Sequence, residues 1–271
     1  MSNVIVFLTV RDRSKSTFRC LQSLFETARG RVDVFVFDNA SAPELSALWA
    51  TYKIFIDFGL IKSLVVNRPG SMPGAEKFSK PWAFRQMMLM MSMFPPDQAE
   101  YMLQIDNDVY VEDGWLDACI EVLESGPAQA SKIKVVSAWN GPPRYDTIKT
   151  IPAAGRQIEV RDAVGGAFWF ARVDHWRSMR PPIANWYDDC QLWDQMKKKG
   201  QRFGVIVPPL AHDAPDSGYS ARLRYGEGEF TDEDREAFEK ARKEIEIPKP
   251  PKQPEPGMMI TGRNPPTKHG F

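Results

Sequence analysis

The chain has 271 residues, which is enough for one α/β domain that buries a sizeable core. Hydrophobic residues make up 43% and charged residues 26%, which are the values of an ordinary globular protein. Lys+Arg and Asp+Glu both number 35, and this balance excludes a whole-protein field that would attract nucleic acid or a membrane surface.

The first half of the chain alternates between apolar runs and amphipathic segments. Four short apolar runs predict strands that are buried on both faces, at residues 4–10, 32–37, 63–66 and 101–105. Amphipathic segments predict the intervening helices at residues 16–29, 43–55 and 80–94. For the first helix we expect a cap at Ser16 or Thr17 and a buried face that includes Phe18 and Phe25. The alternation predicts a doubly wound, mostly parallel central sheet flanked by helices.

The second half is less regular. Helices are predicted at 115–124 and 188–199, and strands at 133–138 and 203–207. The stretch after Gly141 has little periodicity, and the apolar run 163–171 is interrupted by Gly165-Gly166. We therefore expect one main domain at 1–215, made of two halves at 1–112 and 113–215. Residues 216–271 are predicted to form an extension with a charged helix and a flexible, Pro-rich tail.

The strongest chemical signal is Asp106-Asn107-Asp108, directly after a predicted buried strand. Two carboxylates one residue apart can hold a hard divalent cation, Mn²⁺ or Mg²⁺, which prefers oxygen ligands and commonly bridges protein carboxylates to phosphates. Asp38 and Asn67 also follow predicted strands, and ligands of doubly wound sheets bind beyond the carboxyl ends of the strands. A surface turn is the alternative, because Asp and Asn favour turns.

Taken together, these motifs resemble family 2 of the glycosyltransferases, which has the GT-A fold. The resemblance covers about residues 4–214 and keeps the family's order of motifs. Its matching segments are the first strand, Asp38-Asn39-Ala40-Ser41, Asp106-Asn107-Asp108, Gly165-Gly166-Ala167-Phe168, Tyr187-Asp188-Asp189, Gly200 and His212. The resemblance implies transfer of a sugar from a nucleoside diphosphate sugar to an acceptor hydroxyl, with inversion at the anomeric carbon and with Mn²⁺ or Mg²⁺ as cofactor.

The resemblance also implies that 1–215 is a catalytic domain with a nucleotide-binding half at 1–112 and an acceptor half at 113–215. It further implies roles for single residues. Asp106 and Asp108 would hold the metal, and His212 would be a third ligand or contact the diphosphate. Asp189 or Asp188 would be the general base that takes the proton of the acceptor hydroxyl. The residues expected to bind the nucleotide sugar are Thr9, Arg11, Asp38, Asn67, Asp106, Asn107 and Gly166.

The chain departs from the family pattern at the base motif, where Asp188 replaces a glutamate and Gln191 an aspartate. The choice of base between Asp188 and Asp189 therefore stays open, and both acids also suit a helix N-terminus without any catalysis. Trp139 and Trp169 are either core residues or platforms for a sugar ring.

For the donor we expect a UDP-sugar rather than a GDP-sugar. The acceptor is a saccharide, a lipid-linked sugar, a protein, a small molecule or a hydroxymethylated DNA base. Two other functions compete: a nucleotidyltransferase, which would usually need a glycine-rich phosphate loop after the first strand, and a binding module without chemistry. Residues 10–15 contain no glycine, and both acidic pairs are intact, so both alternatives rank lower.

Three cysteines far apart, Cys20, Cys119 and Cys190, argue against a disulfide framework and fit a reducing compartment. The N-terminus has neither the basic nor the long apolar region of a signal peptide. No run of residues approaches 18 consecutive apolar positions, so no transmembrane helix is expected. A cytoplasmic location is the expectation.

Overall fold

The computed structural model describes residues 4–10, 13–39, 46–67, 86–89, 99–141, 145–181 and 188–214. The chain divides between Tyr225 and Gly226, and all of these residues belong to the first unit. The predicted extension at 216–271 lies outside the described residues. No helix in the described ranges is both long enough and apolar enough to cross a membrane.

The elements of the first half follow the predicted alternation. They are β1 (Val4–Val10), α1 (Ser14–Ala28), β2 (Val32–Asn39), α2 (Ser46–Asp57), β3 (Ile61–Asn67), β4 (Tyr101–Asp106) and β5 (Val109–Val111). Of the predicted helix at 80–94, the structure describes residues 86–89, which are helical, and Met87 and Met88 are buried there as expected of core residues.

The second half contains four helices and six strands among the described residues. They are α4 (Trp115–Glu124), α5 (Gly126–Ala130), β6 (Ile133–Ser137), β7 (Thr147–Ala153), β8 (Arg156–Arg161), β9 (Phe168–Arg172), α6 (Val173–Arg177), α7 (Asp188–Lys198), β10 (Arg202–Val207) and β11 (Ala211–Asp213).

Among the described residues, the central sheet has nine strands in the order β3-β2-β1-β4-β9-β6-β10-β8-β7. The strands β3, β2, β1 and β4 pair in parallel, and so do β6 and β10. Of the strands that the structure describes in this sheet, β9 and β8 run against the others, since both pair antiparallel to their neighbours. The sheet is therefore mostly parallel, as predicted. A second small sheet pairs β5 with β11.

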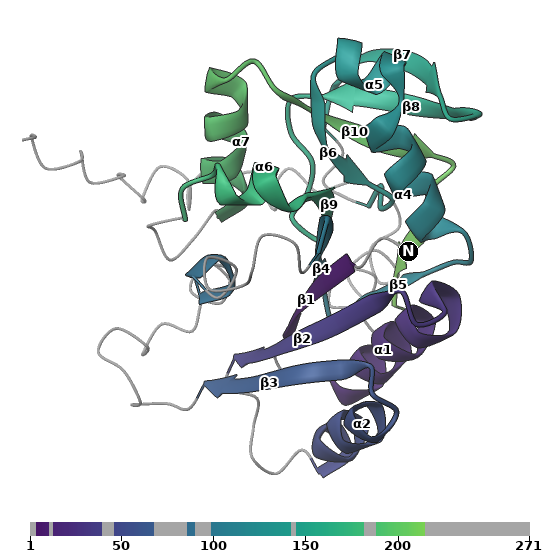
Figure 1. Ribbon diagram of the computed structural model, residues 1–271, viewed down its shortest axis with the longest axis vertical. Helices are drawn as coiled ribbons and strands as arrows, with labels where there is room; N and C mark the ends of the chain where they lie inside the picture. Colours follow the sequence, from purple (N-terminus) through teal and green to yellow (C-terminus); the bar gives the residue numbers. More distant parts are fainter. Residues whose placement is uncertain are drawn as a thin grey trace, which may run out of the picture. The chain divides into compact units, whose positions relative to one another are not determined.

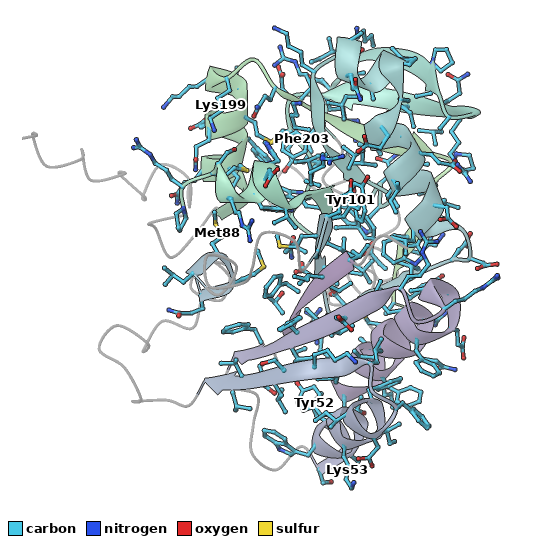
Figure 2. All side chains as sticks on the ribbon, in the orientation of Figure 1. Tyr52, Lys53, Met88, Tyr101, Lys199 and Phe203 are labelled. Carbon is cyan, nitrogen blue, oxygen red and sulfur yellow. The ribbon has the colours of Figure 1, made fainter. Side chains whose placement is uncertain are left out.

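Helices cover both faces of the sheet (Figure 1). Along β1 the side chains alternate, so that Val6 and Leu8 join a core with α1, α2 and α4. Ile5 and Phe7 point to the opposite face and join a second core with α6, α7 and Met88. Side chains fill the space between the sheet and these helices (Figure 2). Burial on both faces explains why the parallel strands read as continuous apolar runs.

The start of α1 corrects the sequence prediction. The helix begins at Ser14, and Arg13 occupies the N-cap position without a side-chain cap. Ser16 and Thr17 lie inside the first turn and are buried. The Thr17 hydroxyl donates back to Arg13 O at 2.9 Å and also accepts from another element, so it does not cap the helix.

The buried face of α1 also differs from the prediction. Leu21 and Leu24 are fully buried, whereas Phe18 and Phe25 are 39% and 43% exposed. Both phenyl rings contact Phe55 of α2 at centroid distances of 5.6 and 6.4 Å. The two phenylalanines therefore lie at the solvent-exposed edge of the contact between α1 and α2 rather than in the core.

Candidate functional site

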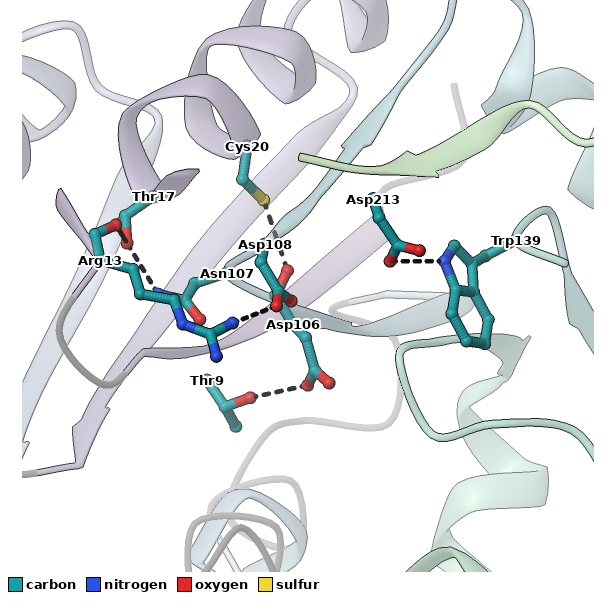
Figure 3. Close-up of polar contacts among 9 residues, drawn as sticks. All are labelled: Thr9, Arg13, Thr17, Cys20, Asp106, Asn107, Asp108, Trp139 and Asp213. Atoms are coloured by element: carbon teal, nitrogen blue, oxygen red, sulfur yellow. Dashed lines mark hydrogen bonds and ion pairs between the residues drawn. The ribbon is translucent and has the colours of Figure 1, made fainter. Parts of the chain in front are cut away.

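Asp106 ends β4 and lies beside Thr9, its partner in register on β1 (Figure 3). Thr9 Oγ1 and Gln104 Nε2 both donate to Asp106 Oδ1, each at 3.1 Å. The strand order changes direction at this point, because β1 lies between β2 and β4. Ligands of doubly wound sheets bind at such switch points, beyond the carboxyl ends of the strands. The structure thus brings together two residues that were predicted to bind the nucleotide sugar, Thr9 and Asp106, at a place where a ligand is expected.

Asn107 anchors the turn after β4 to the first turn of α1. Its side chain is buried, and Nδ2 donates to Thr17 Oγ1 at 2.9 Å. The thiol of Cys20, also on α1, lies 3.8 Å from Asp106 O. Buried side chains therefore hold the backbone of Asp106 and Asn107 against α1. The Asn107 amide is therefore engaged by the protein, and its contact with the nucleotide sugar stays a prediction.

Asp108 presents its carboxylate near solvent. Its side chain is 17% exposed, and Oδ2 forms an ion pair with Nη1 of Arg13, whose side chain is 41% exposed (Figure 3). Pairs this exposed contribute about 0.2–1 kcal/mol to stability. The carboxylate of Asp108 is therefore already in contact with one positive charge, through an interaction that is weak enough to be exchanged.

Asp213 is a site residue that the sequence analysis did not identify. It pairs with Val109 across the β11–β5 ladder, and Ala214 N donates to Asp108 O at 2.6 Å. Asp213 Oδ1 accepts from Trp139 Nε1 at 3.0 Å. The pKa of the Asp213 carboxyl is raised, mainly because the group is buried. The hydrogen bond from Trp139 opposes this shift, and the negative charge of Asp106 adds to it. Asp213 therefore adds a third carboxyl to the surroundings of Asp106.

Trp139 fits between two glycines and positions Asp213. A Cβ atom on Gly165 would lie 2.6 Å from Trp139 Cζ3, and one on Gly141 would lie 2.1 Å from Cζ2. The indole is 6% exposed, and Trp169, whose Nε1 donates to Gly165 O at 2.8 Å, is 1% exposed. Both tryptophans are therefore core residues in this structure. Position 165 needs a glycine because a Cβ atom there would overlap the Trp139 ring.

His212 lies on the opposite side of β11 from Asp213, because successive side chains of a strand alternate. It pairs in register with Tyr110, and the two rings are 5.4 Å apart. Its Nε2 lies 3.0 Å from Glu112 Oε1, within ion-pair distance but without the geometry of a hydrogen bond. Among the described residues, no three His, Cys, Asp or Glu side chains are arranged to hold a metal ion. The predicted ligands Asp106, Asp108 and His212 thus do not form one ligand set here.

Two further residues were predicted to bind the nucleotide, Asp38 on β2 and Asn67 on β3. Asp38 is fully buried, and its Oδ2 accepts from the Tyr52 hydroxyl of α2 at 2.8 Å. Asn67 ends β3 in register with Asn39, but its side chain lies outside the described residues, as does all of Arg11. Asp38 is therefore placed beside the switch point, with its carboxyl engaged by the protein.

The segment before β9 links the site to α7. Asp106 N donates to Ala167 O at 3.0 Å, so the Gly165-Gly166-Ala167 segment runs beside the end of β4. Trp193 Nε1 of α7 donates to Val164 O at 3.0 Å. Asp188 and Asp189 begin α7, and position 189 lies about one helical turn before Trp193. Their side chains lie outside the described residues, so their role as the base stays a prediction.

Two residues that the sequence analysis missed carry weak signals. Arg13 lies in a short polar segment after the first strand, and nothing in the sequence distinguishes it from the other polar residues there. Asp213 stands directly after His212, and the alternation of a strand decides that only one of the two faces Asp106. No sequence periodicity identifies that face, because β11 has only three residues.

No protein-family model matches the chain. No curated protein matches it in sequence. Among solved structures, the mannosyltransferase PcManGT from Pyrobaculum calidifontis, in complex with GDP-Man and Mn²⁺, is 16% identical with a TM-score of 0.51, over 83% of this chain and 61% of that one.

Two further solved structures are similar. TarS 1–349 from S. aureus, in complex with UDP-GlcNAc, is 13% identical with a TM-score of 0.51, over 80% of this chain and 59% of that one. GalNAc-T7 with UDP, GalNAc and Mn²⁺ is 10% identical with a TM-score of 0.53, over 79% and 44%. The chain spans between 44% and 61% of the length of these three proteins. At such identities the likeness concerns the fold, which is that of GT-A glycosyltransferases.

Proposed function

We propose that the chain is a glycosyltransferase that moves a sugar from a nucleoside diphosphate sugar to an acceptor hydroxyl. The observation that carries this proposal is the position of Asp106 and Asp108 at the switch point of a GT-A sheet, where Thr9 donates to Asp106. Sites for nucleotides occur at this place in doubly wound sheets. The three similar structures were obtained with GDP-Man, UDP-GlcNAc or UDP, and these ligands define the donor classes to test.

A divalent cation, Mn²⁺ or Mg²⁺, fits the side chains at this site. Asp106 and Asp108 offer carboxylate oxygens, and the Asp108 carboxylate is in contact with a guanidinium, so a positive charge is accommodated there. Such cations are commonly bound by one or two protein carboxylates together with substrate phosphates and water. We assign Asp108 and Asp106 as ligands and keep His212 as a candidate for the diphosphate side. A bound cation would neutralise charge on the diphosphate as it leaves.

The donor's nucleotide would lie along the carboxyl ends of β1, β2 and β3. Thr9, Asp38 and Asn67 end or nearly end these strands, and Arg11 follows β1 directly. Since the Asp38 carboxyl already accepts from Tyr52, we assign it to positioning unless the donor displaces that contact. The preference for a UDP-sugar over a GDP-sugar stays a prediction.

The transfer itself would be performed by the second half. The acceptor hydroxyl attacks the anomeric carbon, the new C–O bond forms as the bond to the diphosphate breaks, and Asp189 or Asp188 takes the hydroxyl proton. The Trp193–Val164 hydrogen bond supports this role, because it ties α7 to the segment that runs beside Asp106. Gly166 belongs to that segment and would let a sugar approach the backbone. An inverting outcome is what the family resemblance implies, and it stays a prediction.

The first test is a thermal-shift measurement on the full chain with UDP, GDP, UDP-sugars and GDP-sugars, each with and without Mn²⁺. A ligand that binds only the folded state stabilises it by about 2.7 kcal/mol at a hundredfold excess over Kd. We expect a Mn²⁺-dependent shift with one nucleotide class, and its loss in Asp108→Asn. Asp113→Asn is the matched control, because Asp113 also pairs with an arginine, Arg29, but is 69% exposed and lies outside the site.

The same measurement separates the competing functions. A binding module without chemistry would keep its nucleotide shift without Mn²⁺ and in Asp108→Asn. A nucleotidyltransferase would respond to a nucleoside triphosphate rather than to a diphosphate. No shift with any nucleotide would contradict the proposal. The acceptor, whether a saccharide or another hydroxyl compound including a modified DNA base, and a cytoplasmic location stay predictions.

A further inference from the structure

Arg13 has a fixed backbone and a displaceable side chain. Its backbone is left-handed, with φ 58° and ψ 57°, a conformation that costs energy for a residue other than glycine. Both Thr17 N and Thr17 Oγ1 donate to Arg13 O at 2.9 Å, and Asn107 Nδ2 donates to the same Thr17 hydroxyl. The turn that carries Asp108 therefore also holds the backbone of Arg13 in place.

The side chain of Arg13 contacts the carboxylate that the proposed function assigns to the metal. Nη1 pairs with Asp108 Oδ2, and the pair is exposed to solvent at 41% for Arg13 and 17% for Asp108. A guanidinium carries five N–H donors and suits phosphate oxygens as well as carboxylates. A second arginine nearby, Arg19, lies instead over the Tyr110 ring at 4.2 Å from its centroid. Arg13 is thus a cation in direct contact with the Asp108 carboxylate.

A divalent cation and the Arg13 guanidinium carry charge of the same sign, so they repel each other and compete when both approach the Asp108 carboxylate. If a divalent metal binds Asp108 together with a diphosphate, the Arg13 guanidinium loses its partner at the moment when new phosphate oxygens arrive beside it. We propose that Arg13 is an exchanging cation of the donor site: it pairs with Asp108 before the donor binds and moves to the diphosphate when the metal takes Asp108. This inference rests on the proposed function and names the residue that couples metal binding to donor binding.

The exchange predicts two opposite effects of one substitution. In Arg13→Gln, Mn²⁺ alone should bind about two- to fivefold more tightly, because an exposed ion pair no longer competes for Asp108. The same variant should bind UDP or GDP at saturating Mn²⁺ about tenfold or more weakly, because charge-assisted hydrogen bonds to phosphate are lost. Both affinities are measured by isothermal titration calorimetry on the full chain.

Arg29→Gln is the matched control. Arg29 flanks the other end of α1, is also left-handed at φ 51°, and also pairs with an aspartate, Asp113. We expect it to leave both affinities unchanged. Arg13→Lys is the second variant, and it keeps the charge without the planar guanidinium. Its nucleotide affinity should lie between those of the wild type and Arg13→Gln, which distinguishes exchange from a loss of folding.

The outcomes are distinct. Tighter Mn²⁺ binding with weaker nucleotide binding in Arg13→Gln supports the exchange. Weaker binding of both ligands, or unchanged nucleotide affinity, would overturn it and leave Arg13 a structural residue. If the wild type binds neither UDP nor GDP in the presence of Mn²⁺, the proposed function fails and the exchange fails with it. If the wild type binds a nucleotide and Arg13→Gln binds it equally well, the exchange alone is contradicted.

Discussion

Two glycines set the geometry of the site by leaving room for the ring of Trp139. The indole donates to Asp213 only because Gly141 and Gly165 leave room for its ring. Protein interiors are close-packed, so an added methyl group must displace one of its neighbours. At the residue scale, the arrangement of carboxyl groups near Asp106 therefore depends on two missing side chains.

Gly165→Ala should displace the Trp139 ring, because the new Cβ would lie 2.6 Å from Cζ3. Overpacking of this kind costs about 1–3 kcal/mol of unfolding free energy. Urea unfolding measures the change. The control is Gly126→Ala, where no atom lies within 4 Å of the added Cβ and the free energy of unfolding should stay the same or rise slightly. Equal stability of the two variants would contradict this account of Gly165.

At the scale of elements, α2 is fastened to the sheet through a buried polar contact. Tyr52 is 1% exposed, and its hydroxyl reaches Asp38 at the end of β2. The helix α2 also packs on α1 through apolar contacts, in which the buried Phe55 meets Phe18 and Phe25. The single hydroxyl therefore helps to decide where β2 ends relative to α2.

Tyr52→Phe should lower the free energy of unfolding by about 1–3 kcal/mol, since a buried carboxyl oxygen loses a donor while the packing volume is kept. Lys53→Gln, one position along the same helix (both are labelled in Figure 2), removes an exposed i,i+4 ion pair with Asp57 and should cost no more than about 0.5 kcal/mol. Urea unfolding of both variants tests the difference. A cost for Lys53→Gln equal to that of Tyr52→Phe would argue against the role of the buried contact.

The hairpin of β7 and β8 shows where element prediction failed. Its two-residue turn, Ala154-Gly155, has positive φ at both positions, which is normally indicated by Asn-Gly or Asp-Gly. β7 lies at the edge of the sheet, is mostly exposed, and contains Pro152. An exposed edge strand needs no apolar run and tolerates a proline, so the usual strand signals are absent there.

At the scale of the whole molecule, one buried histidine makes stability depend on pH. His175 of α6 is 8% exposed, and none of the described residues forms a hydrogen bond with its Nε2. Burial, together with the charges of Lys199 and Lys134, lowers the pKa of His175 to about 4. The folded state therefore resists protonation at a pH where the unfolded chain accepts a proton.

The sign of the effect follows from the lowered pKa. Above pH 6.5 His175 is neutral in both states and contributes nothing, while below pH 6.5 the unfolded state gains protons first, so stability falls until pH 4. Between pH 7 and pH 5 we expect a loss of about 2 kcal/mol from this group. Urea unfolding at both pH values should show a smaller loss in His175→Gln. An unchanged pH dependence in that variant would contradict the assignment.

The sequence by itself determined the alternating first half and the place of the carboxylate pair. Strands buried on both faces must be apolar throughout, so the sequence predicts β1 and β4. Asp106 is the first acidic residue after the apolar run of β4, which marks it as a candidate site residue. The helix α4 was predicted at the residues where it occurs, because its apolar positions recur with helical spacing.

Only the tertiary structure decided which side chains meet. Arg13 reaches Asp108 across 95 positions of sequence, and Trp139 reaches Asp213 across 74. His212 and Asp213 are adjacent, yet the register of β11 on β5 turns them to opposite sides. Periodicity reports which face of an element is buried, but it carries no information about the partner on that face. Long-range packing and strand register therefore fixed the chemistry of the site.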